Sequence, residues 1–283
     1  MSLSRKNQYL RAVDRHISNV TAKIIRRQML NYPVIGYTIT YDRVKEVYPM
    51  SESKMETKAV RRLRKEALRE QRRKANEPPR RPLLEEIGNA VTHGIGAALS
   101  LVALILLLLR SHTALQRTAS CIYGLCLFLL FLMSCLYHAF RSGSKVKRVF
   151  RRFDYSSIYL LIGGTFAPVL LLYLDQPLGL ILFIAQWILI AAGISIIGVF
   201  GPAVVKALHT AMYFILGWSA LAFIPKMYVQ DFPLFLLTLL GGIAYSVGAI
   251  PFAMKTRGSH FIWHLFVMLG AGLQFFGIYL YIY

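Results

Sequence analysis

The chain carries little charge for its length. Its 283 residues are 16% charged and 56% hydrophobic, whereas a soluble domain has roughly 25% charged residues. Residues 1–82 hold 21 of the 33 Lys and Arg and 8 of the 13 Asp and Glu, which leaves 12 and 5 for the rest of the chain. The shortage of charge therefore lies after residue 82, where the sequence argues against a soluble globular domain.

Cysteine is also scarce. Cys121, Cys126 and Cys135 all lie in one apolar run, and an odd count within one predicted helix is not a disulfide framework. We expect them to be small buried residues. The sequence shows no Gly-rich phosphate loop and no internal repeat. The N-terminal region has no apolar stretch followed by a small-residue cleavage site, so no cleavable signal peptide is expected.

What the sequence has instead is a series of seven long apolar runs. A helix needs about 20 mainly apolar residues to cross the bilayer core, and backbone groups in lipid must be hydrogen-bonded within the segment. The runs are too long and continuous for the alternating strands of a β-barrel. We therefore predict an all-α membrane protein, a seven-transmembrane helix bundle with antiparallel neighbours. The predicted spans are 89–109, 119–140, 154–174, 178–200, 207–224, 232–253 and 260–283.

The loop charges predict an orientation. If the basic N-terminal region is inside, the inside loops carry nine Lys and Arg, and the outside loops carry only Arg110, Arg117 and Lys226. This asymmetry follows the positive-inside rule. The prediction is a cytoplasmic N-terminus and an external C-terminus, with a basic extension at 1–82 and a seven-span domain at 83–283. We expect a multi-pass protein of the plasma membrane.

The basic extension has a net charge of +13, from 21 basic and 8 acidic residues. Beside membrane spans, such charge most simply indicates a segment near anionic lipid headgroups. Nucleic-acid binding is the rival interpretation, although no specific nucleic-acid partner is expected. The sequence of the extension predicts a basic helix at 2–30, a short strand at 37–41, and a charged helix at 53–76 that ends before Pro78 and Pro79.

Ionisable residues within membrane spans are costly and are candidates for function. His138, Asp154, His260 and His264 fall at the same predicted depth, near the cytoplasmic face. His260 and His264 are four residues apart and share a helix face, so they can bind one ion together. Three histidines plus water is a known zinc arrangement. Asp154 could position the water or orient an imidazole, and Ser134 could hydrogen-bond a developing oxyanion.

Simpler interpretations exist for each of these groups. A histidine pair at helical spacing can hydrogen-bond between helices without a metal. His93 and His209 are predicted to be packed histidines rather than ligands. Glu85 and Glu86 precede the first span, where negative charge favours a helix start. The alternative for these two glutamates is a polar contact with the metal region.

Four sequence strings carry a resemblance to a known family. They are EEIGNAVTHG at 85–94, SCLYH at 134–138, FDYSSIYLLIGGTFAP at 153–168 and HFIWHLF at 260–266. In this order they resemble the hemolysin III family, the bacterial branch of the progestin and adipoQ receptor family, from about residue 85 onward. The resemblance implies seven helices and zinc bound by His138, His260 and His264. The family's Asp and Ser positions fall on Asp154 and Ser134, and alkaline ceramidases carry a similar pattern.

Three functions remain open at this point. The first is a membrane hydrolase that acts on a lipid amide or ester. The second is a non-catalytic sensor of membrane state with a structural zinc ion. The third is a cytolytic pore, which the family name suggests but for which the spans show no polar lining. Membrane lipids are the expected partners in each case.

Overall fold

The computed structural model describes residues 58–254 and 256–283, and every regular element in these ranges is helical. The predicted helix at 2–30 and strand at 37–41 lie outside the described residues. Helix α4 (Lys58–Ala75) matches the described part of the helix predicted at 53–76. It belongs to a unit separate from Asn76–Tyr283. Within α4, Arg73 hydrogen-bonds Glu70 through two nitrogens at 2.8 Å, which lowers the pKa of Glu70.

The second unit is a bundle of membrane-spanning helices. Six helices are long and apolar enough to cross a membrane, or seven if one bent pair counts as a single span. This confirms the all-α membrane fold. The elements are α5 (Leu83–Leu109), α6 (Ala114–Ala139), α7 (Lys145–Pro168) with the π turn η1 (Val169–Tyr173), α8 (Leu178–Phe200), α9 (Lys206–Trp218) with the 3-10 turn η2 (Ser219–Ala222), α10 (Ile224–Gln230), α11 (Phe232–Ala253) and α12 (Ser259–Tyr281).

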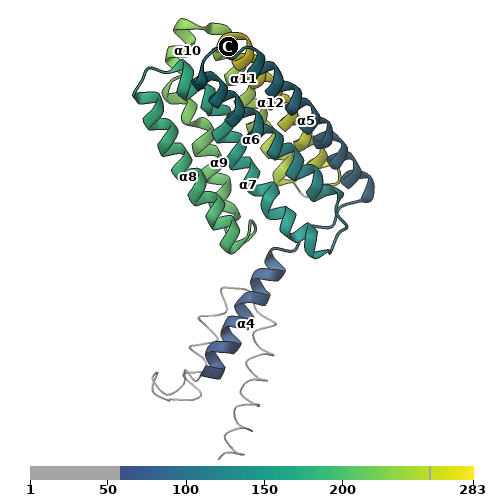
Figure 1. Cartoon of the computed structure of the whole chain (residues 1–283). Helices are drawn as coiled ribbons and strands as arrows, with labels where there is room; N and C mark the ends of the chain where they lie inside the picture. The colour runs from purple at the N-terminus through teal and green to yellow at the C-terminus, as the bar shows by residue number, and fades with distance from the viewer. Residues whose placement is uncertain (1–57, 255) are drawn as a thin grey trace, which may run out of the picture. The chain divides into compact units, whose positions relative to one another are not determined.

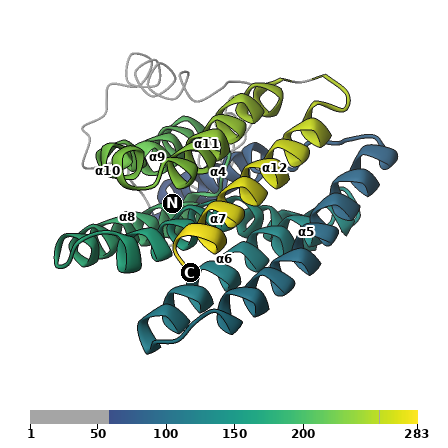
Figure 2. The same cartoon turned by 90° about the horizontal axis from the view of Figure 1, so that it is seen from above.

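The bundle is a ring in which consecutive spans are antiparallel, whereas the first and last helices, α5 and α12, run in the same direction. Consecutive spans pack together, and the last helix, α12, contacts both α11 and the first helix, α5. Figure 1 shows the helices from the side, and Figure 2 shows the ring from above. Helices α5, α7, α9 and α12 begin at one end of the bundle. We call it the basic end, because Arg141, Lys145 and Lys206 lie there, before or at the starts of α7 and α9. The C-terminus lies at the other end.

The start of α7 differs from the prediction. The third span was expected to begin at residue 154, after a basic loop, but α7 begins at Lys145. The Ser144 hydroxyl caps this helix by accepting a hydrogen bond from the Lys147 backbone N–H at 3.0 Å. Serine is one of the residues preferred at this capping position. The basic segment therefore forms the first turns of α7, and Lys147 and Arg151 are buried. Similarly, α5 begins at Leu83, six residues before the predicted start.

The fifth span is not the single straight helix predicted at 207–224. It consists of α9 with η2 (Lys206–Ala222) followed by α10 (Ile224–Gln230), with a bend of 42° between the two parts. Pro225 lies in the first turn of α10. Proline has no N–H to donate to the preceding turn, and its ring clashes with a continuing helix. The break at this point therefore has a local cause in the sequence.

Small residues allow α6 and α7 to approach closely. A β-carbon added to Gly164 would overlap the side chain of Cys126 on α6. All three cysteines are free thiols, but only Cys126 is buried as expected, whereas Cys121 and Cys135 are partly buried. This contact sets the distance between the two helices that carry Ser134 and Asp154.

Substitution of Gly164 should therefore destabilise the bundle. We expect Gly164→Leu to lower the free energy of unfolding by about 1–3 kcal/mol, because overpacking forces neighbouring backbone apart. The measurement is unfolding of purified protein in detergent. Gly272→Leu is the matched control, since no atom lies within 4 Å of a β-carbon there. Equal stability of the two variants would contradict close packing at Gly164.

The orientation from the loop charges stays a prediction, and it can be tested at the C-terminus. Alkaline phosphatase fused after Tyr283 should be active in a bacterial host, because the enzyme folds only outside the cytoplasm. A green fluorescent protein that requires the cytoplasm should stay dark at the same position. The reverse pair of results would show that the predicted orientation is wrong.

Candidate metal centre

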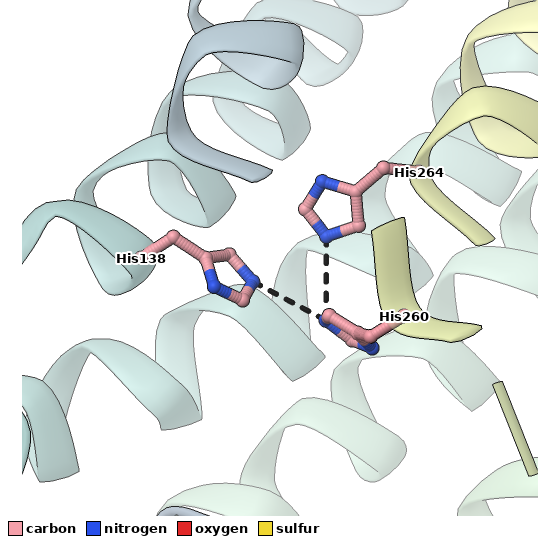
Figure 3. A group of neighbouring side chains, drawn as sticks. All are labelled: His138, His260 and His264. Carbon is pink, nitrogen blue, oxygen red and sulfur yellow. Dashed lines mark hydrogen bonds between the residues drawn. The ribbon is translucent and has the colours of Figure 1, made fainter. Parts of the chain in front are cut away.

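Three histidines from two helices meet at the basic end. His138 lies in the last turn of α6, and His260 and His264 lie in the first two turns of α12. Figure 3 shows their imidazoles pointing toward one another. The Nε2 atom of His260 is 3.2 Å from Nε2 of His138 and 3.3 Å from Nε2 of His264. All three side chains are buried, and one ring nitrogen from each lies within 4.8 Å of the others.

The hydrogen-bonding capacity of the three imidazoles argues for a cation between their rings. Nδ1 of His138 lies 2.6 Å from a carboxylate oxygen of Glu86, which can only accept when ionised. In a neutral ring the proton is then on Nδ1, and Nε2 presents a lone pair. The single Nε2 of His260 cannot both donate to His138 and accept from His264. Without a shared ligand, at least one of the two contacts sets like groups face to face.

A metal ion bound by three lone pairs satisfies all these nitrogens together. Metal–nitrogen bonds of about 2.0–2.1 Å at tetrahedral angles place two ligand atoms about 3.3 Å apart. The two short separations in this cluster agree with that value. The residues present therefore fit a metal ion, and His138, His260 and His264 are the group that could hold it.

Asp154 and Ser134 lie at the same end. Ser134 is one turn before His138 on α6, and Asp154 lies in the third turn of α7. Both residues line the same cavity as His260 and His264. His138 is not among the residues that line this cavity. The structure thus brings all five predicted site residues to one end of the bundle, and four of them face one space.

The cavity is long and mainly apolar. Its volume is about 180 Å³, and its wall comes largely from α7, α9, α11 and α12. The lining residues on α12 extend from His260 to Ile278, a distance of about 27 Å along a helix. This length approaches the roughly 30 Å thickness of the bilayer core. Polar groups that could do chemistry are gathered at the basic end of this space.

Two further histidines behave differently from one another. His209 accepts or donates a hydrogen bond of 2.9 Å with the Tyr159 hydroxyl, and it is not one of the three clustered histidines. His93 lines the cavity and stacks on His264 with ring centroids 3.7 Å apart. It is buried, and neither of its ring nitrogens has a hydrogen-bond partner among the described residues. His93 is therefore packed as expected, but it lies beside the cluster and its imidazole is not satisfied by a hydrogen bond from the described residues.

Two residues outside the predicted site residues contact the cluster. The carboxylate of Glu86 contacts both His138 and Lys147, so the polar contact with the metal region, which was the alternative for this residue, is the one found. Lys147 was assigned to a loop, yet it is fully buried. A signal for Glu86 was present in the helical spacing. Buried residues of α5 recur every three or four positions, and polar ones occupy this stripe at Glu86, Asn89, His93 and Ser100.

Comparison with known proteins agrees with this architecture. A family model described as Haemolysin-III related matches residues 82–275. The chain belongs to the haemolysin-III related family. This confirms the resemblance found in the sequence strings. The match begins just before α5, and it leaves residues 1–81 outside the family region.

Individual relatives of this haemolysin III protein include bacterial and animal proteins. It is 43% identical over 203 residues to Hemolysin-3 of Bacillus cereus, covering 70% of this chain and 92% of the relative. It is 37% identical over 202 residues to a Hemolysin-3 homolog of Bacillus subtilis (strain 168), covering 70% and 94%. It is 27% identical over 207 residues to the Monocyte to macrophage differentiation factor of Homo sapiens, covering 70% and 85%.

Metal content tests the cluster directly. We expect purified protein to hold one transition-metal ion per chain, and the double variant His260→Ala, His264→Ala to hold none, because only one of the three clustered imidazoles remains. Elemental analysis by mass spectrometry gives the ratio. His209→Gln, which removes a buried histidine from outside the cluster, is the control and should keep the ion. Equal metal content in all three proteins would rule out this centre.

Proposed function

We propose that this haemolysin III protein is a zinc-dependent hydrolase of a membrane lipid amide or ester. The observation that carries the proposal is a buried three-histidine group at the polar end of a long apolar cavity, beside a carboxylate and a hydroxyl. A zinc ion at this group would make a water molecule acidic and polarise a carbonyl group. His138, His260 and His264 would hold the ion.

The protein's own groups supply the rest of the chemistry. The Asp154 carboxylate faces the cavity and can orient a water molecule and take up its proton. The Ser134 hydroxyl can donate a hydrogen bond to an oxygen that gains negative charge. Both residues line the same cavity as His260 and His264.

The shape of the cavity favours a lipid over a water-soluble substrate. Aliphatic and aromatic side chains line most of its length, among them Leu161, Ile162, Val169, Leu239, Val267 and Ile278. An acyl chain can lie along this wall, with its amide or ester group at the level of the histidines. The same apolar wall disfavours a water-filled pore through the described part of the bundle.

A second candidate is a regulator in which zinc is purely structural. It is favoured by the way the cluster links helices: His138 lies on α6, the other two ligands lie on α12, and Glu86 ties α5 to the same point. In that case chelation would lower the melting temperature, although the intact protein would turn over no lipid.

We place the protein in the plasma membrane, with the basic end toward the cytoplasm. Lys and Arg residues concentrated at this end support that orientation under the positive-inside rule. The charge of residues 1–82 supports contact of the extension with anionic headgroups. In this proposal, membrane lipids both surround the protein and supply its substrate.

The hydrolase proposal predicts a specific loss of activity in Asp154→Asn. Wild-type protein in detergent or liposomes should release free fatty acid from at least one member of a panel of ceramides, acylated lipid amides and glycerol esters. We expect Asp154→Asn to reduce kcat roughly 10²- to 10⁴-fold and to retain the metal. Asp175→Asn, at the opposite end where Asp175 pairs with Lys226 at 2.8 Å, should keep full activity.

Folded and metal-loaded wild-type protein that is inactive on the whole panel would contradict the hydrolase. If chelation lowered its melting temperature as well, the structural candidate would replace it.

A further inference from the structure

Glu86 occupies an unusual position for a carboxylate. It is 6% exposed, in the first turn of a membrane-spanning helix. A buried, unpaired charge costs several kcal/mol, and ionisable groups within spans are rare unless paired. Each oxygen of Glu86 has its own partner. Oε2 lies 2.6 Å from Nδ1 of His138, and Oε1 lies 2.9 Å from Nζ of Lys147.

Lys147, on α7, is the second partner of the Glu86 carboxylate. Its side chain is fully buried, and its ammonium group contacts three acceptors: Glu86 at 2.9 Å, the Phe140 carbonyl at 3.1 Å and the His138 carbonyl at 3.4 Å. An ammonium group has three protons to donate. The two carbonyls belong to the end of α6, where the helix dipole is negative. Lys147 therefore balances the charge of Glu86 and holds the end of α6.

The consequence for His138 is a defined proton position. Its Nδ1 also lies 3.4 Å from Nδ2 of Asn89, which could only donate to it, but the carboxylate oxygen of Glu86 at 2.6 Å is the much closer contact. A lone pair on Nδ1 would face a negative oxygen at that distance, so the proton lies between them. Nε2 of His138 then presents its lone pair toward His260. In contrast, Nδ1 of His264 is buried without a partner among the described residues.

We infer that Glu86 is the positioning residue of the metal centre, and that it orients His138 before the ion binds. Metal-binding histidines commonly donate their other N–H to a carboxylate, and loss of that partner typically weakens metal binding 10- to 100-fold. The inference rests on the proposed metal site. It makes His138 the ligand that is fixed in advance, whereas His264 has no such support.

A purely structural ion pair between α5 and α7 is the alternative, and two double variants separate the two ideas. Glu86→Met with Lys147→Met removes both the charges and the acceptor for His138. Glu86→Gln with Lys147→Met removes the same charges but keeps a neutral oxygen that can accept from Nδ1. Neither leaves an unpaired buried charge, and apolar replacement of a buried pair is often tolerated.

The measurement is Zn²⁺ affinity by competition with a chelator of known affinity, together with the melting temperature of each metal-free protein. We expect the variant with Gln to bind Zn²⁺ roughly 10-fold or more tightly than the variant with Met at equal stability. A structural ion pair predicts the same affinity for both, and that result would overturn the inference. As control, Glu77→Met with Arg148→Met removes a partly exposed pair at the same end and should leave the affinity unchanged.

A second readout needs no variant at position 86. Nitrogen-15 NMR of histidine-labelled, metal-free wild type distinguishes the two tautomers, and His138→Gln identifies the signal. We expect the proton of His138 on Nδ1; a proton on Nε2 would overturn the inference even if the double variants fail to fold. Absence of Zn²⁺ binding by wild type would instead overturn the metal site itself.

Discussion

The stability of the bundle depends on pairing buried polar groups with one another, because no water is available to hydrogen-bond them. At the basic end, one carboxylate from α5, one ammonium from α7 and one imidazole from α6 meet within hydrogen-bonding distance. Each of these groups alone would be costly in the interior of a membrane protein. Together they neutralise one another and leave a single imidazole nitrogen directed at α12. The arrangement that makes the buried charges tolerable also holds one proposed ligand in place.

A second constraint is geometric. The three histidines lie on α6 and α12, which are far apart in the sequence but both pack against α5. Close approach of α6 and α7 through Gly164 brings Ser134 within reach of Asp154. The apolar cavity then extends away from these groups between α7, α9, α11 and α12. The polar groups thus lie at one end of the cavity, and the apolar wall extends along the rest of its length. A lipid molecule has the same division between a polar headgroup and apolar chains.

Hydropathy predicted the spans well where the helices are apolar throughout. The fourth and sixth spans, Leu178–Phe200 and Phe232–Ala253, have the predicted bounds. It failed where charged residues are buried in pairs. A scale for single residues treats Glu86 and Lys147 as groups in water, because the partner that neutralises each lies 61 positions away. The bend near Pro225 was not predicted, because the fifth span was taken to end at residue 224, and composition alone did not show that a helix would continue to Gln230.

The candidate ligands could be grouped from the sequence because depth in a membrane is a strong restraint. His138 closes one span and His260 opens another, so antiparallel helices bring them to one level. Which rings face one another, and which carboxylate supports them, depends on helix rotation. That rotation is set by side-chain packing, and it could be read only in part from the polar residues along the buried stripe of α5.

The place of α12 in the chain also has a consequence for biosynthesis. Translation proceeds from the N-terminus, so Glu86, His138 and Lys147 are all made well before the final helix. That trio can form as soon as three helices are inserted. His260 and His264 arrive only when the ring closes against α5. A nascent chain therefore has a prepared half-site but no complete centre, and capture of the ion would mark the last step of maturation.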